Sequence, residues 1–228
     1  MIIAIDGPAG SGKSTVAHAI AERCGVTYLD TGAMYRSVTL ACLRRGVDLD
    51  DADAVAAVAR EVRIEFGNDG TRQTVMLDGQ DVTADIRTPE VDRNVSVVSA
   101  VPAVRSAMVA LQRAGGEQGD GVAEGRDIGT VVFPNAEVKV FLTADAEARA
   151  HRRAVQREGG DAAKDATAQA DTAQERAILE EIRRRDKLDS TRKEAPLRAA
   201  DDAHHIDSSS MGVDEVVSEV MRLMEEAR

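Results

Sequence analysis

The stretch Gly7-Pro8-Ala9-Gly10-Ser11-Gly12-Lys13-Ser14 decides the fold of this 228-residue chain. It matches G-x-x-x-x-G-K-[ST] at every fixed position and lies between an apolar run and a segment with helical spacing. Glycines in such a loop let backbone N–H groups point inward around phosphate oxygens, at the positive end of the following helix. Lys13 can bridge the outer phosphates, and the Ser14 hydroxyl can ligate Mg²⁺. The stretch therefore predicts a nucleoside triphosphate site.

The segments around this loop alternate between strand and helix patterns. Residues 2–5 form a short apolar run, and Val16, Ile20 and Cys24 then recur every fourth residue until Gly25. This spacing predicts a strand, a loop and a helix. Further helices are expected at 33–45 and 53–62, and strands at 27–30, 121–127 and 138–142. Because strands alternate with helices, we expect an α/β fold with a parallel sheet flanked by helices.

Residues 63–87 change the period of the pattern. Apolar and polar residues alternate there around two turn signals, Asn68-Asp69-Gly70 and Asp78-Gly79, which predicts a small antiparallel insertion. Helices are expected to begin at Pro89 and at Pro102, the second running to about residue 114. Val104, Met108 and Leu111 are expected on one face of that helix, and a final helix is expected at 213–226.

Composition and charge exclude several classes of function. A formal net charge of -11 argues against broad binding to nucleic acid, because such binding requires a positive surface. Only five apolar residues precede Asp6, so we expect a buried strand there rather than a signal peptide or a membrane span. Cys24 and Cys42 fall at apolar helical positions, which indicates reduced core thiols and a cytoplasmic location.

The phosphate loop alone leaves the reaction open among GTPases, motor ATPases and small-molecule kinases. The chain has no N-K-x-D motif for reading guanine and no apolar strand that ends in Asp-Glu, so a kinase for a small acceptor is favoured. If that acceptor carries a phosphate, arginines should converge on it, since their planar groups pair bidentately with phosphate. Five arginines are candidates: Arg36, Arg105, Arg126, Arg185 and Arg192.

The candidate arginines lie in different local settings. Arg126 directly follows a predicted buried strand, where open α/β sheets bind their ligands. Arg185, Asp189 and Arg192 are spaced at i, i+4 and i+7, which places them on one helical face, with a salt-bridged surface as the alternative. In Leu29-Asp30-Thr31-Gly32-Ala33-Met34-Tyr35-Arg36, Asp30 could cap the helix, orient Arg36 or contact Mg²⁺ through water.

Five blocks of sequence together resemble one family. The blocks are I-D-G-P-A-G-S-G-K-S-T, L-D-T-G-A-M-Y-R, D-G-Q-D-V-T-A-D-I-R-T-P-E-V, G-R-D-I-G-T-V-V-F-P-N-A and R-R-D-K-L-D-S-T-R-x-x-A-P-L. They occur in this order between residues 5 and 197, and the chain resembles the bacterial cytidylate kinases. The resemblance implies transfer of the γ-phosphoryl group of ATP to CMP or dCMP, with Mg²⁺ bound at Ser14.

The resemblance also implies roles for individual residues. ATP would be held by residues 7 to 15, the last being Thr15. Lys13, Arg126, Arg185 and Arg192 would be catalytic, and the acceptor would be bound by Thr31, Arg36, Ser96, Arg105, Arg126, Asp127, Arg185, Asp189 and Arg192. The chemistry of cytosine fits these assignments, because Asp127 can accept from the N4 amino group while Arg105 and Ser96 donate to O2 and N3.

The family fold implied is a P-loop nucleoside monophosphate kinase with a five-stranded parallel sheet. We expect a core domain of residues 1–62, 88–150 and 174–228, a substrate-side insertion at 63–87 and a lid region at 151–173. The Ala- and Asp-rich segment 158–172 is longer than the short lid typical of the family. A monomer without membrane or nucleic-acid partners is expected. The alternatives are a P-loop kinase for another acceptor, such as UMP, or a non-catalytic nucleotide sensor.

Overall fold

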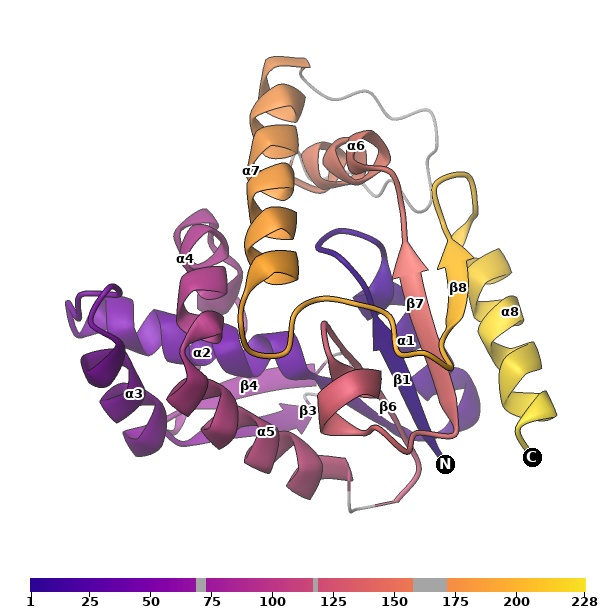
Figure 1. The fold of residues 1–228 in the computed structure, drawn as a ribbon, viewed down its shortest axis with the longest axis horizontal. Helices are drawn as coiled ribbons and strands as arrows, with labels where there is room; N and C mark the ends of the chain where they lie inside the picture. The colour runs from indigo at the N-terminus through magenta and orange to yellow at the C-terminus, as the bar shows by residue number, and fades with distance from the viewer. Residues whose placement is uncertain (69–72, 117–118, 158–171) are drawn as a thin grey trace. The chain divides into compact units, whose positions relative to one another are not determined.

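The structure is a computed structural model that describes residues 1–68, 73–116, 119–157 and 172–228. These residues form two compact units (Figure 1). Unit 1 consists of Met1–Leu29 with Gly116–Arg228, and unit 2 consists of Asp30–Gly115.

Unit 1 is built on a five-stranded sheet. Its strands are β1 (Ile2–Asp6), β2 (Thr27–Asp30), β6 (Gly121–Gly125), β7 (Val138–Thr143) and β8 (His204–Asp207), in the order β2-β6-β1-β7-β8. The central strand β1 runs parallel to both β6 and β7, and β7 runs parallel to β8. The α/β class and the parallel sheet expected from the sequence are thereby confirmed.

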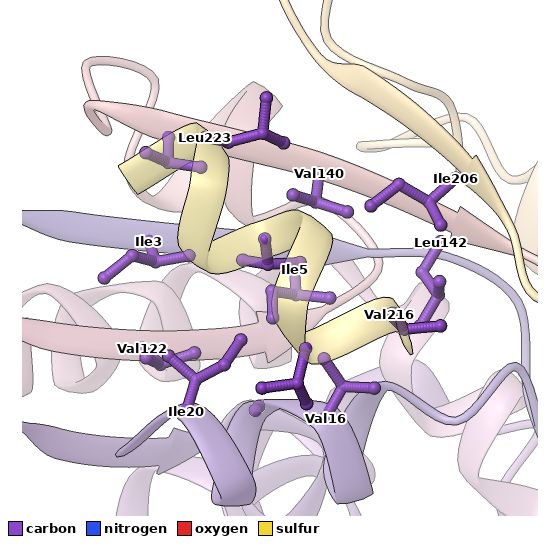
Figure 2. Packing of buried hydrophobic residues seen from close by; sticks show 14 of the residues in the cluster. Ile3, Ile5, Val16, Ile20, Val122, Val140, Leu142, Ile206, Val216 and Leu223 are labelled. Atoms are coloured by element: carbon purple, nitrogen blue, oxygen red, sulfur yellow. The ribbon is translucent and has the colours of Figure 1, made fainter. Parts of the chain in front are cut away.

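Two helices bury their apolar faces against this sheet. They are α1 (Lys13–Cys24), with the expected Val16 and Ile20 in the core, and α8 (Val213–Glu226). Figure 2 shows side chains of the strands meeting those of both helices in one cluster. The cluster consists almost entirely of aliphatic side chains, as the low aromatic content of 2% requires. The sheet core therefore sits directly beneath the phosphate loop, which connects β1 to α1.

A second helical layer of unit 1 is formed by α6 (Ala146–Arg157) and α7 (Thr172–Thr191). These two helices lie against each other (Figure 1). They pack through Ala150, Ala154, Ile178 and Ile182. A short π-helical turn, η2 (Ile128–Val132), follows β6. Segment 158–171, which includes most of the expected lid, lies outside the described residues. The expected domain division therefore stays a prediction.

Unit 2 combines helices with a small antiparallel sheet. Its helices are α2 (Thr31–Arg44), α3 (Ala52–Glu61), η1 (Asp85–Arg87), α4 (Pro89–Ala100) and α5 (Pro102–Gly116). Its strands are β3 (Ile64–Asn68), β4 (Gln73–Leu77) and β5 (Gln80–Asp81), paired in the order β3-β4-β5. The expected antiparallel insertion is confirmed, and Asp78 and Gly79 adopt the positive φ angles of a tight hairpin turn. Residues 69 and 70 of the other expected turn lie outside the described residues.

Three details differ from the sequence expectations. Helix α2 begins at Thr31 rather than at residue 33, because Asp30 caps it. In α5, Val104 and Met108 are buried as expected, but Leu111 is 42% exposed and Gln112, at 1% exposed, is buried in its place. Strand β8 was not expected at all, because its sequence is polar and only Ile206 is buried. Pairing with β7, rather than its own residues, makes this segment a strand.

Both cysteines are free thiols, as expected, and Cys42 is buried. Among the helices that the structure describes, none alone is long and apolar enough to cross a membrane. The pair α4 and α5 satisfies that criterion only when joined, and the two are bent by 97°.

Candidate active site

The phosphate loop of unit 1 has a backbone that only glycine tolerates at key positions. Gly7, Gly10 and Gly12 have φ angles of 151°, 78° and 92°, in the left-handed region that other residues rarely adopt. A Cβ atom on Gly7 would lie 2.0 Å from the backbone oxygen of Leu142. The loop therefore packs closely against the end of β7. It leads into the N-terminus of α1, where backbone N–H groups can bind phosphate.

Lys13 is the first residue of α1 and its side chain is held inside the loop. The ammonium donates to the backbone oxygen of Pro8 at 2.7 Å, and the residue is 4% exposed. Burial lowers the pKa of Lys13 to about 7, and the positive charges of Arg126 and Arg185 contribute to the decrease. Lys13 is therefore a desolvated cation that an incoming anion would stabilise.

Ser14 meets a carboxylate that the sequence reasoning missed. Its hydroxyl donates to Glu124 Oε1 at 2.5 Å, and the Tyr28 hydroxyl donates to the same oxygen at 3.1 Å. Glu124 is buried near the carboxyl end of β6. The signal that could have found it is an acidic residue within the otherwise small and apolar run G-V-A-E-G. Such a residue requires a polar partner when buried.

Arg126 and Asp127 follow β6 and form ion pairs with residues at the end of α7 and just beyond it. Arg126 Nε donates to Asp189 Oδ2 at 3.0 Å, and Arg192 lies 3.5 Å from Asp127 Oδ1. Arg185 Nε lies 4.0 Å from the same oxygen of Asp189. The structure therefore brings together the five predicted residues of unit 1 that lie outside the phosphate loop.

The expected helical face of Arg185, Asp189 and Arg192 is correct only in part. Arg185 and Asp189 are one turn apart on α7, but this helix ends at Thr191. Arg192 lies beyond that end and donates to the backbone oxygen of Ala195 at 2.6 Å. The chain bends after the helix, and Arg192 pairs with Asp127 from this bend. The alternative of a salt-bridged solvent surface does not fit, because the side chains of Asp189 and Arg192 are each 5% exposed and that of Arg185 is 19% exposed.

A second ion pair, formed by a buried arginine and a half-buried carboxylate, connects the phosphate loop to α7. Arg149 on α6 donates to the backbone oxygen of Ala9 at 2.9 Å and pairs through two nitrogens with Asp186. A Cβ on Gly10 would lie 3.4 Å from the Cβ of Arg149, so the loop lies flat against this side chain. Neither Arg149 nor Asp186 was singled out from the sequence, because helices rich in charged residues ordinarily have solvated faces.

The Arg149–Asp186 pair leads to a stability prediction. Asp186→Ala should lower the free energy of unfolding by about 3 kcal/mol, because it leaves the Arg149 guanidinium buried without its carboxylate. The matched control is Glu147→Ala, which breaks the pair of Glu147 with Arg183 between the same two helices at 65% and 61% exposure. An exposed pair is worth less than about 1 kcal/mol. Urea unfolding of both variants measures the difference, and equal losses would contradict a structural role for the buried pair.

Asp30, in unit 2, has two partners that define its role. Its Oδ1 accepts from the backbone N–H of Ala33 at 2.9 Å, and its Oδ2 accepts from Arg87 at 3.0 Å. Of the three roles left open by the sequence, the structure supports the helix cap. The carboxylate that holds Arg36 is instead Asp92, at 2.5 Å, together with the backbone oxygen of Ile86 at 2.9 Å.

The other predicted residues of unit 2 are also buried. Thr31 begins α2, Ser96 lies on α4 and Arg105 lies on α5. The Arg105 guanidinium lies 5.5 Å from the centre of the Tyr35 ring and donates to the backbone oxygen of Ser99 at 3.3 Å. A ring face and a carbonyl thus hold the guanidinium group of Arg105 in place.

The fold and this set of groups define a P-loop kinase of the nucleotide-kinase class. The family model described as "Cytidylate kinase" matches residues 3–226. The chain is 48% identical to a cytidylate kinase of Rhodococcus opacus, over 99% of this chain and 95% of that protein. It is 50% identical to a cytidylate kinase of Mycobacterium avium, over 98% and 95%. The chain belongs to the cytidylate kinase family.

A solved structure of an uncharacterized protein from Eubacterium ventriosum shares the fold. Its TM-score is 0.50 at 16% identity, over 99% of this chain and 98% of that one.

Proposed function

We propose that this protein is a phosphotransferase that moves the γ-phosphoryl group of ATP to CMP or dCMP, giving ADP and CDP or dCDP. The observation that carries the proposal is the convergence of positive charge in unit 1. The charges of Arg126 and Arg185 oppose protonation of Lys13, in addition to the effect of burial. Cations that repel one another in this way are stabilised by a polyanion, such as a triphosphate facing an acceptor phosphate. Family membership supplies cytidylate as the acceptor.

For the donor, we assign ATP to the phosphate loop. The loop amides and Lys13 would bind the β- and γ-phosphates, while Arg185 and Arg192 would neutralise charge on the transferring group. Arg126 and Arg36 would orient the attacking phosphate oxygen of the acceptor. This oxygen is already largely ionised near neutral pH, so no general base is required. Positioning and electrostatic stabilisation therefore account for the proposed chemistry.

For the acceptor, we assign reading of the base to Asp127, Arg105 and Ser96. The Asp127 carboxylate would accept a hydrogen bond from the N4 amino group, a donor that uracil lacks. Arg105 and Ser96 would donate to O2 and N3. Thr31 would contribute near the acceptor phosphate, and Asp189 would accept from the ribose. Uracil would place a carbonyl against the buried Asp127 carboxylate, and mismatches of this kind reduce selectivity constants by orders of magnitude.

For Mg²⁺, the oxygens of Ser14 and Glu124 form a fitting pair. Mg²⁺ prefers oxygen ligands and is commonly held by one or two protein groups together with substrate phosphates. A hydroxyl and a buried carboxylate in direct contact meet this requirement. Among the described residues, no three His, Cys, Asp or Glu side chains cluster as a metal site, which agrees with sharing of the ion with phosphate. When bound, Mg²⁺ would neutralise phosphate charge, and Tyr28 would keep Glu124 oriented.

A coupled assay of ADP release tests the proposed function. CMP, dCMP, UMP, AMP, GMP and shikimate should be compared as acceptors at equal concentration, with and without EDTA. We expect turnover with CMP and dCMP that exceeds turnover with UMP by at least about 100-fold, and loss of turnover with EDTA. Equal activity on UMP would contradict the base assignment. Binding of ATP and CMP without ADP release would favour the nucleotide sensor.

The lowered pKa of Lys13 predicts proton uptake when ATP binds. Above pH 7 the free protein holds Lys13 largely neutral, and phosphate oxygens beside it would raise its pKa again. Calorimetry at pH 8 in buffers of different ionisation enthalpy should therefore show uptake of nearly one proton per ATP. The uptake should decline as the pH falls below 7, where Lys13 is already protonated. Unchanged uptake in Lys13→Met would assign the proton to another group.

The expected cytoplasmic location and monomeric state are retained as predictions. Size-exclusion chromatography with light scattering measures the second directly.

A further inference from the structure

Asp6 is a buried carboxylate that the proposed chemistry does not use. It ends the central strand β1 and directly precedes Gly7 of the phosphate loop, and it is 4% exposed. Burial raises the pKa of Asp6 to about 6, in spite of two backbone hydrogen bonds that favour the charged form. A buried carboxylate that carries such a desolvation cost is retained where its hydrogen bonds are needed.

Both hydrogen bonds of Asp6 go to a single turn. Oδ1 accepts from the backbone N–H of Ile128, and Oδ2 accepts from that of Gly129, each at 2.7 Å. These two residues begin the π-helical turn η2. The turn lies close to both Asp6 and Lys139. A Cβ on Gly129 would lie 3.5 Å from Asp6 Oδ2 and 3.2 Å from the Lys139 side chain. The carboxylate therefore holds the first two amides of η2 on the end of β1.

The turn is attached to two of the proposed functional residues. Arg126 and Asp127 occupy the positions between β6 and η2, and Asp6 pairs in register with Gly125 at the end of β6. The backbone oxygen of Asp127 accepts from the N–H of Val131 at 2.9 Å and from that of Val132 at 3.2 Å, which ties Asp127 to η2. A shift of η2 would therefore redirect Asp127 and, with it, Arg126.

We propose that Asp6 is a positioning residue that clamps η2 to the end of β1 and thereby aims Arg126 and Asp127 at the acceptor. The assignment of Arg126 and Asp127 to the acceptor rests on the proposed function. A carboxylate suits this task because each of its oxygens accepts one amide hydrogen. An asparagine of the same shape offers one acceptor and one donor, so it would repel one of the two amides. Lys13 donates its hydrogen bonds to Pro8 and Ser11 within the loop rather than to Asp6, whose charge favours the protonated form of Lys13.

The experiment compares Asp6→Asn with the unchanged enzyme by two independent measurements. Hydrogen exchange of the ligand-free protein should show that the amides of Ile128 and Gly129 exchange at least about 10-fold faster in the variant. Kinetics should show that kcat/KM for CMP falls about 100-fold, the size expected when a reacting group is misplaced by about 1 Å. The ratio of CMP to UMP activity should fall about 10-fold or more, while KM for ATP changes less than about 3-fold. If Asp6 had only a structural role and did not position Arg126 and Asp127, kcat/KM would fall by the same factor for every acceptor.

Two further variants keep the test decisive. Ile3→Val, on the same strand and buried in the core, is the control for lost packing and should leave the CMP to UMP ratio unchanged. Gly129→Ala adds a Cβ 3.2 Å from the Lys139 side chain and 3.5 Å from Asp6 Oδ2, and it should lower the same ratio by a smaller factor, even if Asp6→Asn does not fold. An unchanged ratio in a folded Asp6→Asn or in Gly129→Ala would overturn the proposal. If the unchanged enzyme is inactive on CMP, the proposed function fails, and unchanged exchange at Ile128 and Gly129 would still refute the clamp.

Discussion

Replacement of Lys13 by alanine should reduce kcat by at least about 10³-fold while the protein stays folded. The loss of one preorganised group that stabilises transition-state charge costs about 10²–10³-fold. Lys13 is in addition the only loop side chain with a full charge. Single-turnover measurement of ADP formation at saturating ATP separates the chemical step from weakened binding. Retained turnover would refute the assignment of the donor site.

Measurements of the free energy of unfolding show whether the loss of kcat on replacing Lys13 arises from the chemistry or from unfolding. Burial lowers the pKa of Lys13 in the folded protein from 10.5 to about 7, so the unfolded chain binds its proton more tightly between these values. Lys13 therefore costs stability at pH 7, and the unchanged protein gains stability as the pH rises from 7 toward 10.5. Lys13→Met, which keeps the buried stem, should be at least as stable at pH 7. Its advantage should shrink as the pH rises. A large loss of stability at pH 7 would contradict the desolvated state of Lys13.

Replacement of Asp127 by alanine should reduce kcat/KM for CMP about 10²–10³-fold and reduce the weaker UMP reaction far less. The carboxylate is the proposed acceptor for the cytosine amino group, and sites built to hydrogen-bond a substrate group discriminate strongly. The substitution also leaves the buried Arg192 without this partner, which should affect both reactions equally. The ratio of the two losses therefore isolates the reading of the base.

Asp189→Ala is the matched control for Asp127→Ala. It likewise removes a buried carboxylate from an arginine, here the half-buried Arg126, but Asp189 faces no group that differs between cytosine and uracil in the proposed arrangement. It should lower CMP and UMP turnover by similar factors. Equal losses on both substrates in Asp127→Ala as well would mean that Asp127 does not read N4.

Much of the fold could be predicted from local patterns. The order of β1, the phosphate loop and α1 follows from an apolar run, fixed glycines and a four-residue repeat, all of which act over a few residues. Helix α8 was expected with the bounds it has, because its valines recur at helical spacing. In the structure, Glu215 also accepts from the backbone N–H of Gly212 at the start of the helix. Strand β8 could not be predicted in this way, because its extended form depends on hydrogen bonds to β7, far away in the sequence.

The residues of the candidate site also fall into two groups: those that a local sequence pattern predicts and those whose partners are distant in sequence. Lys13 and Ser14 were found from a motif, because phosphate binding needs a run of neighbouring amides and therefore leaves a contiguous pattern. Glu124, Asp92 and Arg149 were missed. Each works through a partner that is distant in sequence, as when Glu124 accepts from Ser14 across 110 positions. No local spacing marks such a residue.

The sequence by itself determined the chemical class of this protein: a phosphate loop, a parallel α/β core and the arginines and carboxylates of the cytidylate kinase family. Only the tertiary structure decided which of these charges meet. Arg126 pairs with Asp189, and Asp6 accepts hydrogen bonds from the amides of η2. Arg192 pairs with Asp127, because α7 ends one residue before Arg192. The physical reason is that burial makes an unpaired charge costly, so the fold must supply each partner from another element.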